Sequence, residues 1–401
     1  MRIAMIACTL YPLDPRVTRA AEALAESGHE VDVFAIEQDG VKGSSDRGPI
    51  RVRLLPMRRR RAGLSRYVYE YGAFFCWALV QVTLFHARRR YRVVYVHNMP
   101  NFLVFAGLLP KIGRAKVVLD VHDPAAELMA DIRGRDLPPW AKRLADAEER
   151  VSISFSDTLI TVNESMRRRL SATSPRPVSV VMNIPDLRHF VPLEASRDES
   201  GFQWIVYAGS VAHRNGVDLA VRAVSLLADE FPLLRFRVVG EGPDLESVAR
   251  LAGDLGVADR VEFRGLVPNE EIPALLSDAT AGISPQRGGV FGSLVFSMKV
   301  AEYVALGVPV ICSGIDTMRH YFSDDDLLFF EPENAEDLAR AIRAHLTDPA
   351  AAGKRVAKSQ AKLDELGWPT QKMALVGTVE ALTDPGKPLD KEITKHAWSE
   401  N

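Results

Sequence analysis

The segment from Pro285 to Pro309 (PQRGGVFGSLVFSMKVAEYVALGVP) combines residue types that can hold a phosphorylated ligand. Three glycines let its backbone approach a ligand closely: Gly288, Gly289 and Gly292. Lys299 and Glu302 follow three positions apart, so they share one face of a helix. The lysine can pair with a diphosphate, and the glutamate can accept hydrogen bonds from vicinal hydroxyls such as those of a ribose. The alternative is a simple surface ion pair, but the order of glycine loop, cation and acid favours a nucleotide site.

A second loop with similar potential, GSVAHRNG, follows the apolar run WIVYA and precedes a helix expected from Val217. Gly209 and Gly216 permit a tight backbone, and the N-terminus of a helix favours anions. Arg214 could pair with a phosphate through two hydrogen bonds, although a solvated loop arginine is an equally good interpretation. The pattern GEG at Gly240, after the next apolar run, is by itself a weak sign of nucleotide binding.

Positive charge is concentrated in residues 51–92, which hold eleven arginines, no lysine and one acid, Glu70. Within this window a helical apolar pattern includes AFFCWALVQVTLF, from Ala73 to Phe85, a stretch shorter than the roughly 20 residues that span a bilayer. Two interpretations remain open: a core helix with solvated basic ends, or a helix that contacts an anionic membrane surface. Nucleic acid is not an expected partner, because the charge is confined to one window and no recognition motif accompanies it.

The composition is that of a globular protein. The 401 residues carry a formal charge of −2, with 47% hydrophobic and 25% charged residues. The three cysteines, Cys8, Cys76 and Cys312, lie far apart, which excludes a disulfide scaffold and a CxxC metal site. The chain starts with MRIAMIA and has no basic region before a long apolar stretch, so we expect a cytoplasmic protein.

Apolar strands alternate with helical segments in two series, separated by a Pro- and Ser-rich break at about 171–200. Expected strands of the first series are 2–7, 30–35, 92–98, 116–123 and 158–164. Those of the second are 204–208, 235–240, 260–265, 281–285 and 309–313. This alternation predicts an α/β protein with two doubly wound, Rossmann-like domains. In such sheets ligands bind at the carboxyl ends of the strands.

Several segments together resemble a known family. KVAEYVALGVPVI, YAGSVAHRNGVDLAVRA, VVGEGPDLE and RVEFRGLVPNEEIPALLSDATAGISP are similar, in matching order, to the donor site of retaining GT-B glycosyltransferases of family 4. DPRVTRAAEALAESGHEV, YVHN and LDVHD fit the N-terminal half of that family. The resemblance implies a GT-B fold, with two Rossmann-like domains facing across a cleft.

The resemblance also implies roles for single residues. Glu302 would hold the ribose hydroxyls of a nucleotide sugar, and Lys299 and Arg214 would neutralise the diphosphate. Backbone groups from Gly265 to Val267 would cradle the base, and His122 would face the reacting sugar. The expected donor-binding residues are Gly209, Ser210, Arg214, Gly240, Gly265, Val267, Gly288, Gly289, Gly292, Lys299 and Glu302. His122, Arg214 and Lys299 are the expected catalytic residues.

Two positions depart from the usual family pattern. The earlier glutamate of a pair eight positions apart is replaced by Leu294, and the common Arg and Lys of the donor loop fall on Ser210 and Asn215. The chain therefore resembles the subgroup with a Lys-x-x-Glu-Tyr signature, in which backbone amides of the loop at 288–292 hold the donor sugar. No metal site belongs to this layout, so metal-independent catalysis is expected, without a cofactor.

The N-terminal half is expected to bind the acceptor. The candidates are Arg16, His97, Asn98 and Asp123, each with a structural alternative as a turn or capping residue. Asp123 could fix the tautomer of His122 or cap the following helix. Because the basic window lies in this half, a lipid-linked or membrane-adjacent acceptor is suggested, beside a glycan or small molecule, with the protein peripheral to the inner face of the cytoplasmic membrane.

We therefore expect an acceptor domain at 1–190, a nucleotide-sugar domain at 191–366, a helix crossing back to the first domain at 367–384, and a polar tail at 385–401. The predicted reaction moves a sugar from a nucleoside diphosphate sugar to an acceptor hydroxyl with retention. No paired carboxylates for a double displacement can be assigned, so departure on the front face is favoured. Alternatives are a sugar-nucleotide epimerase, an NAD oxidoreductase and a non-catalytic membrane-associated scaffold. The oxidoreductase is disfavoured because this sequence has no glycine motif after its first strand.

Overall fold

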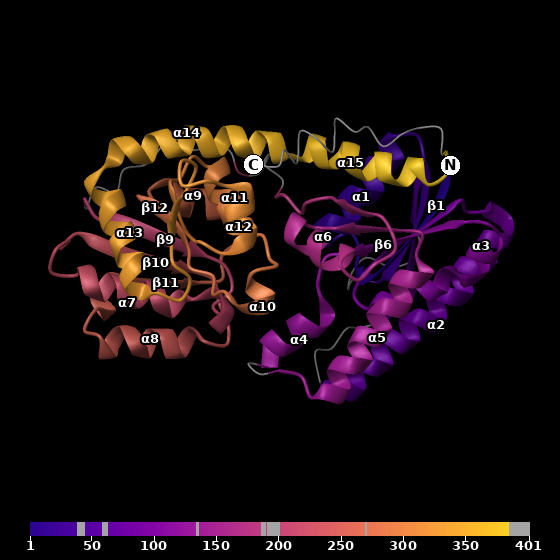
Figure 1. Cartoon of the computed structure of the whole chain (residues 1–401), viewed down its shortest axis with the longest axis horizontal. Coiled ribbons are helices and arrows are strands. Elements are labelled where there is room, and N and C mark those ends of the chain that lie inside the picture. Colours follow the sequence, from indigo (N-terminus) through magenta and orange to yellow (C-terminus); the bar gives the residue numbers. More distant parts are fainter. Residues whose placement is uncertain are drawn as a thin grey trace. The chain divides into compact units, whose positions relative to one another are not determined.

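The computed structural model describes residues 1–37, 45–57, 63–133, 136–185, 190, 201–268 and 271–384. Two compact units make up the chain: unit 1 contains Met1–Asn183 and Pro369–Asn401, and unit 2 contains Ile184–Trp368. Figure 1 shows unit 1 in indigo to magenta with a yellow C-terminal helix, and unit 2 in magenta-red to gold. Each unit is an α/β layer structure around a mostly parallel sheet, so the predicted fold class is confirmed.

The sheet of unit 1 has the strand order β3-β4-β2-β1-β5-β6-β7-β8, and all pairs except β3 with β4 are parallel. Its strands are β1 (Arg2–Leu10), β2 (Glu30–Ile36), β3 (Ser45–Arg47), β4 (Ile50–Leu55), β5 (Val93–His97), β6 (Lys116–Val121), β7 (Thr158–Thr161) and β8 (Val178–Val180). Every residue of β5 is buried, as expected for a strand covered on both faces. The strand order reverses between β1 and β5, and this is where doubly wound sheets place ligands.

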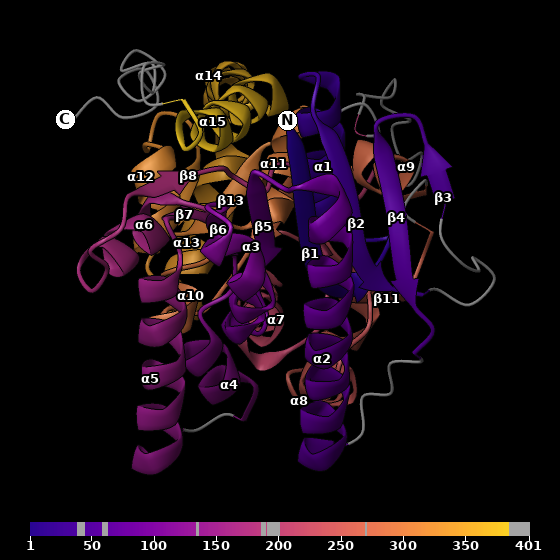
Figure 2. The ribbon, with the colours of Figure 1, turned by 90° about the vertical axis from the view of Figure 1, so that its right-hand side faces the viewer.

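The helices of unit 1 are α1 (Pro15–Glu26), α2 (Gly63–Arg89), η1 (Asn101–Gly107), α3 (Leu108–Ile112), α4 (Ala125–Arg133), α5 (Pro139–Phe155), α6 (Glu164–Ser171) and α15 (Trp368–Ala381). Helix α1 shows how the sequence sets a boundary: the side chain of Asp14 accepts hydrogen bonds from the amides of Arg16 and Val17, and a proline occupies the first turn. Figure 2 shows α2 running along the outer side of this unit.

Helix α2 is longer than the predicted apolar stretch at 73–85. Its 27 residues include a 22-residue segment, Val68–Arg89, that is long and apolar enough to cross a membrane by length and composition. The apolar stretch at 73–85 forms the central part of this helix, in agreement with the predicted helical spacing. Tyr71, Phe74, Ala78 and Val82 recur at helical spacing and are buried, so this face belongs to the core. The arginine run at 58–61 lies outside the described residues.

Unit 2 contains a parallel six-stranded sheet in the order β11-β10-β9-β12-β13-β14. The strands are β9 (Gln203–Ala208), β10 (Leu234–Val239), β11 (Val261–Gly265), β12 (Ala281–Ser284), β13 (Val310–Ser313) and β14 (Leu328–Phe330). Its helices are η3 (His213–Asn215), α7 (Val217–Leu227), α8 (Leu245–Asp254), η4 (Ala258–Arg260), α9 (Ile272–Ser277), α10 (Gly289–Gly292), α11 (Met298–Ala305), α12 (Asp316–Tyr321), α13 (Ala335–Thr347) and α14 (Pro349–Leu366).

The last helix that the structure describes, α15, belongs almost entirely to unit 1. Helix α14 ends in unit 2, whereas α15 contacts the N-terminal half through side chains. The side-chain oxygen of Gln371 accepts a hydrogen bond from the amide of Met182 at 2.7 Å, and the ring of His29 lies 3.1 Å from the carboxylate of Glu380. Unit 1 is thus assembled from both ends of the sequence.

Two predicted strands are shorter than expected at their carboxyl ends. The strand expected at 116–123 ends at Val121, which leaves His122 and Asp123 in a loop. The strand expected at 158–164 ends at Thr161, because the side chain of Asn163 accepts the amide of Met166 and starts helix α6.

Candidate active site

Most of the predicted donor-binding residues lie at the carboxyl edge of the sheet in unit 2. Gly209, Gly240 and Gly265 end or directly follow the neighbouring strands β9, β10 and β11, and the segment at 285–292 follows β12. The amide of Gly240 donates to the carbonyl of Gly265 at 2.8 Å. A Cβ atom added to Gly240 would lie 2.1 Å from the carbonyl oxygen of Gly209. The three loops therefore meet at the level of their backbones, which only a glycine at this position permits.

Lys299, from helix α11, reaches the loop after β9. A Cβ atom at Gly209, whose φ is +146°, would lie 2.4 Å from Cε of Lys299. The Nζ atom lies 5.2 Å from the centroid of the Tyr207 ring, within the range of a cation–π contact. The structure therefore brings together two elements of the predicted donor site, the first glycine loop and the lysine of the Lys-x-x-Glu-Tyr segment.

Burial governs the electrostatics of the Lys299 and Glu302 pair. Burial lowers the pKa of Lys299, against the attraction of the Glu302 carboxylate, and the charge of Arg214 lowers it further. Burial also raises the pKa of Glu302 to about 7, partly opposed by Lys299. Within the described residues neither side chain forms an ion pair, so each is poorly stabilised in its charged form. A ligand with negative phosphates and hydroxyl donors would supply the interactions that both side chains need.

Tyr303, the last residue of the Lys-x-x-Glu-Tyr segment, is a structural support. Its hydroxyl accepts a hydrogen bond from the amide of Ala208 at 2.9 Å, and its ring fills the space beside Gly282. Helix α11 is thereby fixed to the ends of β9 and β12. This contact helps to hold Lys299 and Glu302 in place.

Arg214 lies in η3, within the loop that follows β9. Arg287, which the sequence analysis did not single out, connects this loop to the segment after β12. The amide of Arg287 donates to the carbonyl of Arg214 at 2.8 Å, and its guanidinium pairs with Asp218 at 2.6 Å. Sequence reasoning missed Arg287, although it directly precedes the glycine pair of the donor segment. The side-chain amide of Asn215 donates to the carbonyl of Ser210, so Ser210 contributes its backbone to the shape of this loop.

The predicted glycine loop at 288–292 is in part a helical turn. Residues Gly289–Gly292 form α10, and the side chain of Gln286 donates to the carbonyl of Gly292 at 3.0 Å. The glycine loop therefore includes one helical turn, closed by this hydrogen bond and by the one that the amide of Ser293 donates to the carbonyl of Gly289. Val267 follows β11 and is half-buried, next to a highly exposed Leu266.

Unit 1 contains a buried polar network behind its carboxyl edge. The guanidinium of Arg16 pairs with Asp120 through Nη2 at 2.6 Å and Nε at 3.0 Å, and donates to the carbonyl of Val181. The hydroxyl of Tyr95 also donates to Asp120, and Nδ1 of His97 lies 3.3 Å from the same carboxylate. Although burial raises the pKa of Asp120, Arg16 and His97 hold it well below its usual range. Arg16 is thus a structural partner of Asp120, and a direct contact with an acceptor stays a prediction.

Four of the predicted residues in unit 1 are close together. His97, Asn98, His122 and Asp123 line a pocket of about 190 Å³. The side chain of Asn98 links two loops, because its oxygen accepts from the amide of His122 and its nitrogen donates to the carbonyl of Asp123. Burial lowers the pKa of His122 despite the nearby Asp120 carboxylate, which favours the neutral ring.

Nδ1 of His122 and Nε2 of His97 are buried without a hydrogen-bond partner, whereas Nδ1 of His97 faces the Asp120 carboxylate. Their ring centroids lie 6.5 Å apart. In the described bonds Asp123 contributes its carbonyl, so its expected effect on the His122 tautomer stays a prediction. Two imidazoles and an amide that face one pocket suit a ligand rich in hydroxyl groups.

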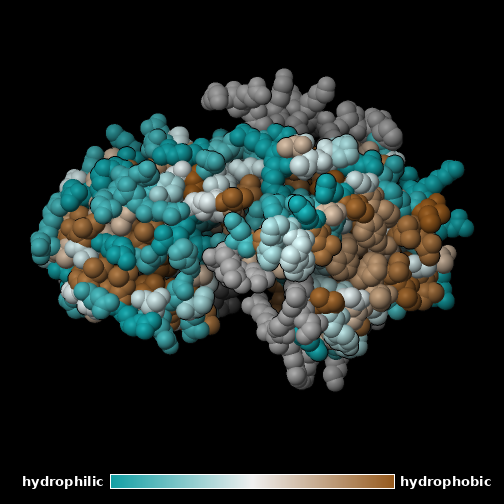
Figure 3. Space-filling model, turned by 60° about the horizontal axis from the view of Figure 1, so that its bottom comes forward, coloured by the Kyte–Doolittle hydropathy of each residue, from teal (hydrophilic) through white to brown (hydrophobic). Residues whose placement is uncertain are grey.

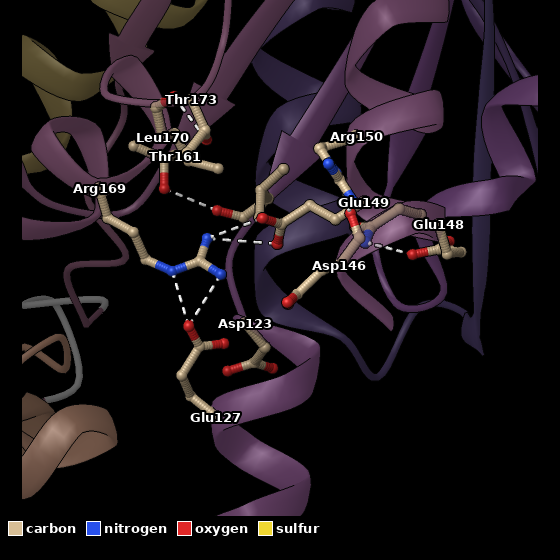
Figure 4. Close-up of polar contacts among 12 residues, drawn as sticks. Asp123, Glu127, Asp146, Glu148, Glu149, Arg150, Thr161, Arg169, Leu170 and Thr173 are labelled. Atoms are coloured by element: carbon tan, nitrogen blue, oxygen red, sulfur yellow. Dashed lines mark hydrogen bonds and ion pairs between the residues drawn. The ribbon is translucent and has the colours of Figure 1, made fainter. Parts of the chain in front are cut away.

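Helix α4, which follows the His122 loop, is held by a salt-bridge clamp (Figure 4). Arg169 of α6 contacts the carboxylate of Glu127 in α4 at 2.8 Å and that of Glu149 in α5 at 3.1 Å. Figure 4 shows Asp123 one turn before Glu127, at the start of α4. The clamp therefore fixes the segment that carries His122 and Asp123.

In the part of the chain that the structure describes, no group of three or more His, Cys, Asp or Glu side chains could hold a metal ion. The expectation of metal-independent catalysis stays a prediction.

Two family models match the chain. Residues 203–348 match "Glycosyl transferases group 1", and residues 13–184 match "Glycosyl transferase 4-like domain". Together the models cover more than three quarters of the chain. The chain is a glycosyltransferase of the GT-B fold. The family models do not favour the epimerase, oxidoreductase and scaffold alternatives.

Individual relatives of this glycosyltransferase have diverse substrates. It is 25% identical to 2-deoxystreptamine glucosyltransferase of Streptomyces kanamyceticus over 84% of this chain and 89% of the relative. It is 27% identical to glycogen synthase of Mycobacterium tuberculosis, with 57% of this chain and 55% of the relative covered. Among solved structures, sucrose-phosphate synthase of Thermosynechococcus elongatus has a TM-score of 0.76 at 18% identity, covering 96% of this chain and all of the other. Anabaena HepE in complex with UDP has a TM-score of 0.69 at 13% identity, covering 95% and 100% of the two chains.

Proposed function

We propose that this glycosyltransferase moves a hexosyl group from a nucleoside diphosphate sugar to an acceptor hydroxyl with retention, as a family 4 enzyme of the Lys-x-x-Glu-Tyr subgroup. The observation that carries the proposal is the placement of Lys299 against the Gly209 loop, one helical turn from a half-buried Glu302. A diphosphate beside Lys299 would restore the stabilisation that its ammonium loses through burial. The UDP bound to Anabaena HepE gives the ligand class.

The proposed chemistry depends on stabilising the leaving diphosphate. Lys299, Arg214 and the amides of helix N-termini stabilise the diphosphate, and the backbone amides of the segment at 288–292 hold the donor sugar. Each well-placed donor of this kind typically contributes roughly 3–4 kcal/mol to the stability of the transition state. Leu294 takes the place of a second acid, so a double displacement through paired carboxylates has no assigned nucleophile. Departure on the front face of the sugar accounts for retention without one, and the cationic side chains replace a metal ion.

The acceptor is proposed to bind unit 1, in the pocket with His97, Asn98, His122 and Asp123. These groups can donate or accept hydrogen bonds, so they suit hydroxyl groups of a glycan, a lipid-linked sugar or a small molecule. Two relatives have names that indicate a small-molecule and a lipid-linked acceptor: a 2-deoxystreptamine glucosyltransferase, and a phosphatidylinositol monomannoside mannosyltransferase of Mycolicibacterium smegmatis. A role in cell-surface glycan, glycolipid or secondary-metabolite synthesis follows from these classes.

Titration calorimetry with nucleoside diphosphates tests the donor site. We expect Glu302→Ala to abolish measurable binding, whereas Glu246→Gln, an exposed acid of α8, should bind as the wild type does. Equal affinity of wild type and Glu302→Ala would refute the ribose role. The configuration of the product anomer, measured by NMR spectroscopy with an activated donor, tests retention independently.

A peripheral membrane contact through residues 51–92, at the inner face of the cytoplasmic membrane, is a second part of the proposal. The outer face of α2 exposes four large apolar side chains: Val68, Tyr69, Val80 and Leu84. Figure 3 shows apolar side chains gathered over the part of the view where unit 1 lies. Liposome flotation should weaken for Val80→Ser/Leu84→Ser but not for the matched pair Leu226→Ser/Leu233→Ser in unit 2. Equal flotation of all three proteins would contradict this contact.

A further inference from the structure

A pocket of about 590 Å³ lies in unit 1, away from the carboxyl edge of its sheet. It is formed where α2 leads into β5 and where α3 leads into β6, with Leu382 and Thr383 after α15 as a third side. These connections lie at the amino ends of β5 and β6, whereas the predicted acceptor residues follow their carboxyl ends. Figures 1 and 2 both show α15 beside the start of β1 at this amino edge. The pocket is therefore separate from the acceptor pocket.

Positive charge dominates the lining of this pocket. Arg90, Arg92, Arg114 and Lys116 contribute to it, together with His86, and no carboxylate is among its lining residues. Lys116 lies 3.9 Å from Asp157, and Arg92 donates to the carbonyl of Thr383. In the described part of the chain no ion pair involves Arg90 or Arg114. Arg90 and Arg114, which are both exposed, therefore line one cavity without a compensating ion pair among the described residues.

The backbone at Arg90 and Arg114 gives an independent reason to assign them a function. Their φ values are 53° and 69°, and among the described residues only Glu333 is another non-glycine with positive φ. Both follow the C-terminus of a helix: the amide of Arg90 donates to the carbonyl of His86, and that of Arg114 to the carbonyl of Lys111. Glycine or asparagine is favoured at such positions, since other side chains are strained there. Local structure therefore disfavours arginine at two sites whose side chains line the same pocket.

We propose that this basic pocket binds a phosphate-bearing ligand with at least two negative charges, at a site distinct from the sugar-nucleotide site. Guanidinium groups pair with phosphate oxygens through two parallel hydrogen bonds, and a cavity of this volume accommodates a small ligand. The phosphate can belong to a free diphosphate or phosphorylated metabolite, or to the headgroup of an anionic lipid. The inference does not depend on the proposed transfer reaction.

His86 provides a local reporter of binding. A Cβ atom at Gly113 would lie 2.9 Å from its Nε2 atom, and its ring lies 6.0 Å from that of Tyr91. Burial lowers the pKa of His86, and the charge of Arg90 lowers it further. A bound polyanion would oppose the effect of Arg90, so the ring resonances of His86 should shift on binding.

The first experiment is a pyrophosphate titration of the full-length protein, followed by histidine side-chain NMR spectroscopy. We expect saturable shifts of His86 in the wild type and in Lys299→Met, in which the sugar-nucleotide site is altered. Arg90→Gly/Arg114→Gly should weaken this binding at least tenfold. Glycine suits both backbone conformations, so the double variant should keep its fold, which thermal unfolding verifies. Arg250→Gln/Lys354→Gln removes two exposed charges of unit 2 and is the matched control.

Vesicle co-sedimentation then distinguishes the two sources of phosphate. If Arg90→Gly/Arg114→Gly loses binding to phosphatidylglycerol vesicles, but the control pair does not, the ligand is a lipid headgroup. If vesicle binding is equal while pyrophosphate binding is weakened, the ligand is a free phosphate compound. If neither pyrophosphate nor anionic vesicles shift His86, or if the double variant binds both as the wild type does, the proposal is wrong.

Discussion

Charged side chains at the carboxyl edges of the two sheets differ in whether they are paired. In unit 1, Arg16 and Asp120 are buried together, and further hydrogen bonds to Tyr95 and Val181 satisfy both. In unit 2, Lys299 and Glu302 are close enough to influence each other. Burial nevertheless lowers the pKa of Lys299 and raises that of Glu302, so it favours the neutral form of both side chains. A paired charge stabilises the fold, whereas a charge without an ion pair can be stabilised by a bound ligand of opposite charge. This difference supports the proposed binding of the charged donor in unit 2 and of the hydroxyl-bearing acceptor in unit 1.

The largest predicted effect tests the structural role of the pair in unit 1. Asp120→Ala leaves Arg16 buried without its carboxylate, which we expect to cost about 3–5 kcal/mol in the free energy of unfolding. Urea unfolding of the two units measures the loss. Nucleoside diphosphate binding by the fraction that remains folded should be unchanged, because the altered residue belongs to unit 1. Unchanged stability would place Asp120 among ligand-binding residues instead.

The converse change in unit 2 should reduce activity without reducing stability. Lys299→Met removes a half-buried cation that forms no ion pair among the described residues, so the free energy of unfolding should stay equal or rise. Without the ammonium group of Lys299 to stabilise the leaving diphosphate, kcat/KM should fall by roughly a hundredfold to a thousandfold. Lys354→Met, an exposed lysine of α14, should behave as the wild type in the same assay. A destabilised variant with normal kcat/KM would reverse the comparison.

The pKa of Glu302 gives a smaller and more specific effect. Because burial raises this pKa to about 7, the carboxylate that we propose to accept ribose hydroxyls is mostly protonated at pH 6 and mostly ionised at pH 8. Donor affinity should therefore increase about tenfold over that range, in proportion to the ionised fraction. Glu302→Gln should bind weakly with no such dependence in calorimetric titrations. A wild-type affinity that falls as pH rises would contradict the assignment.

The smallest predicted effect concerns how unit 1 positions its pocket. Arg169→Met releases Glu127 and Glu149, and we expect a loss of about 1–2 kcal/mol in stability, since the three side chains are only partly exposed. The KM for the acceptor should rise severalfold while the KM for the donor stays constant. Arg168→Met alters a more exposed neighbour on the same helix and provides the control. Equal changes in both KM values would mean that α4 does not act on the acceptor alone.

The sequence predicted the sheets well, because buried parallel strands are continuous apolar runs. The strand expected at 204–208 is β9 (Gln203–Ala208), and that expected at 30–35 is β2 (Glu30–Ile36). Strand β4 (Ile50–Leu55) was missed, since Arg51 and Arg53 interrupt its apolar pattern. Strand β14 (Leu328–Phe330) has only three residues, which is too few for a periodicity to show.

The site was predictable where chemistry follows local spacing and not where it depends on distant contacts. Lys299 and Glu302 are three positions apart, so their relation could be read directly. Arg16 and Asp120 are 104 positions apart, and nothing in the sequence indicates that they pair. The same applies to the contact between Lys299 and Gly209, which depends on how two loops meet at one edge of the sheet.

The return of the chain to unit 1 has a consequence for how the protein is made. A ribosome completes all of unit 2 before it synthesises α15, which caps unit 1 through Gln371 and Glu380. The first half of the polypeptide therefore remains without α15 until all of unit 2 has been synthesised. A premature stop codon before Trp368 would keep every described strand of both sheets. It would nevertheless leave unit 1, which is synthesised first, without helix α15.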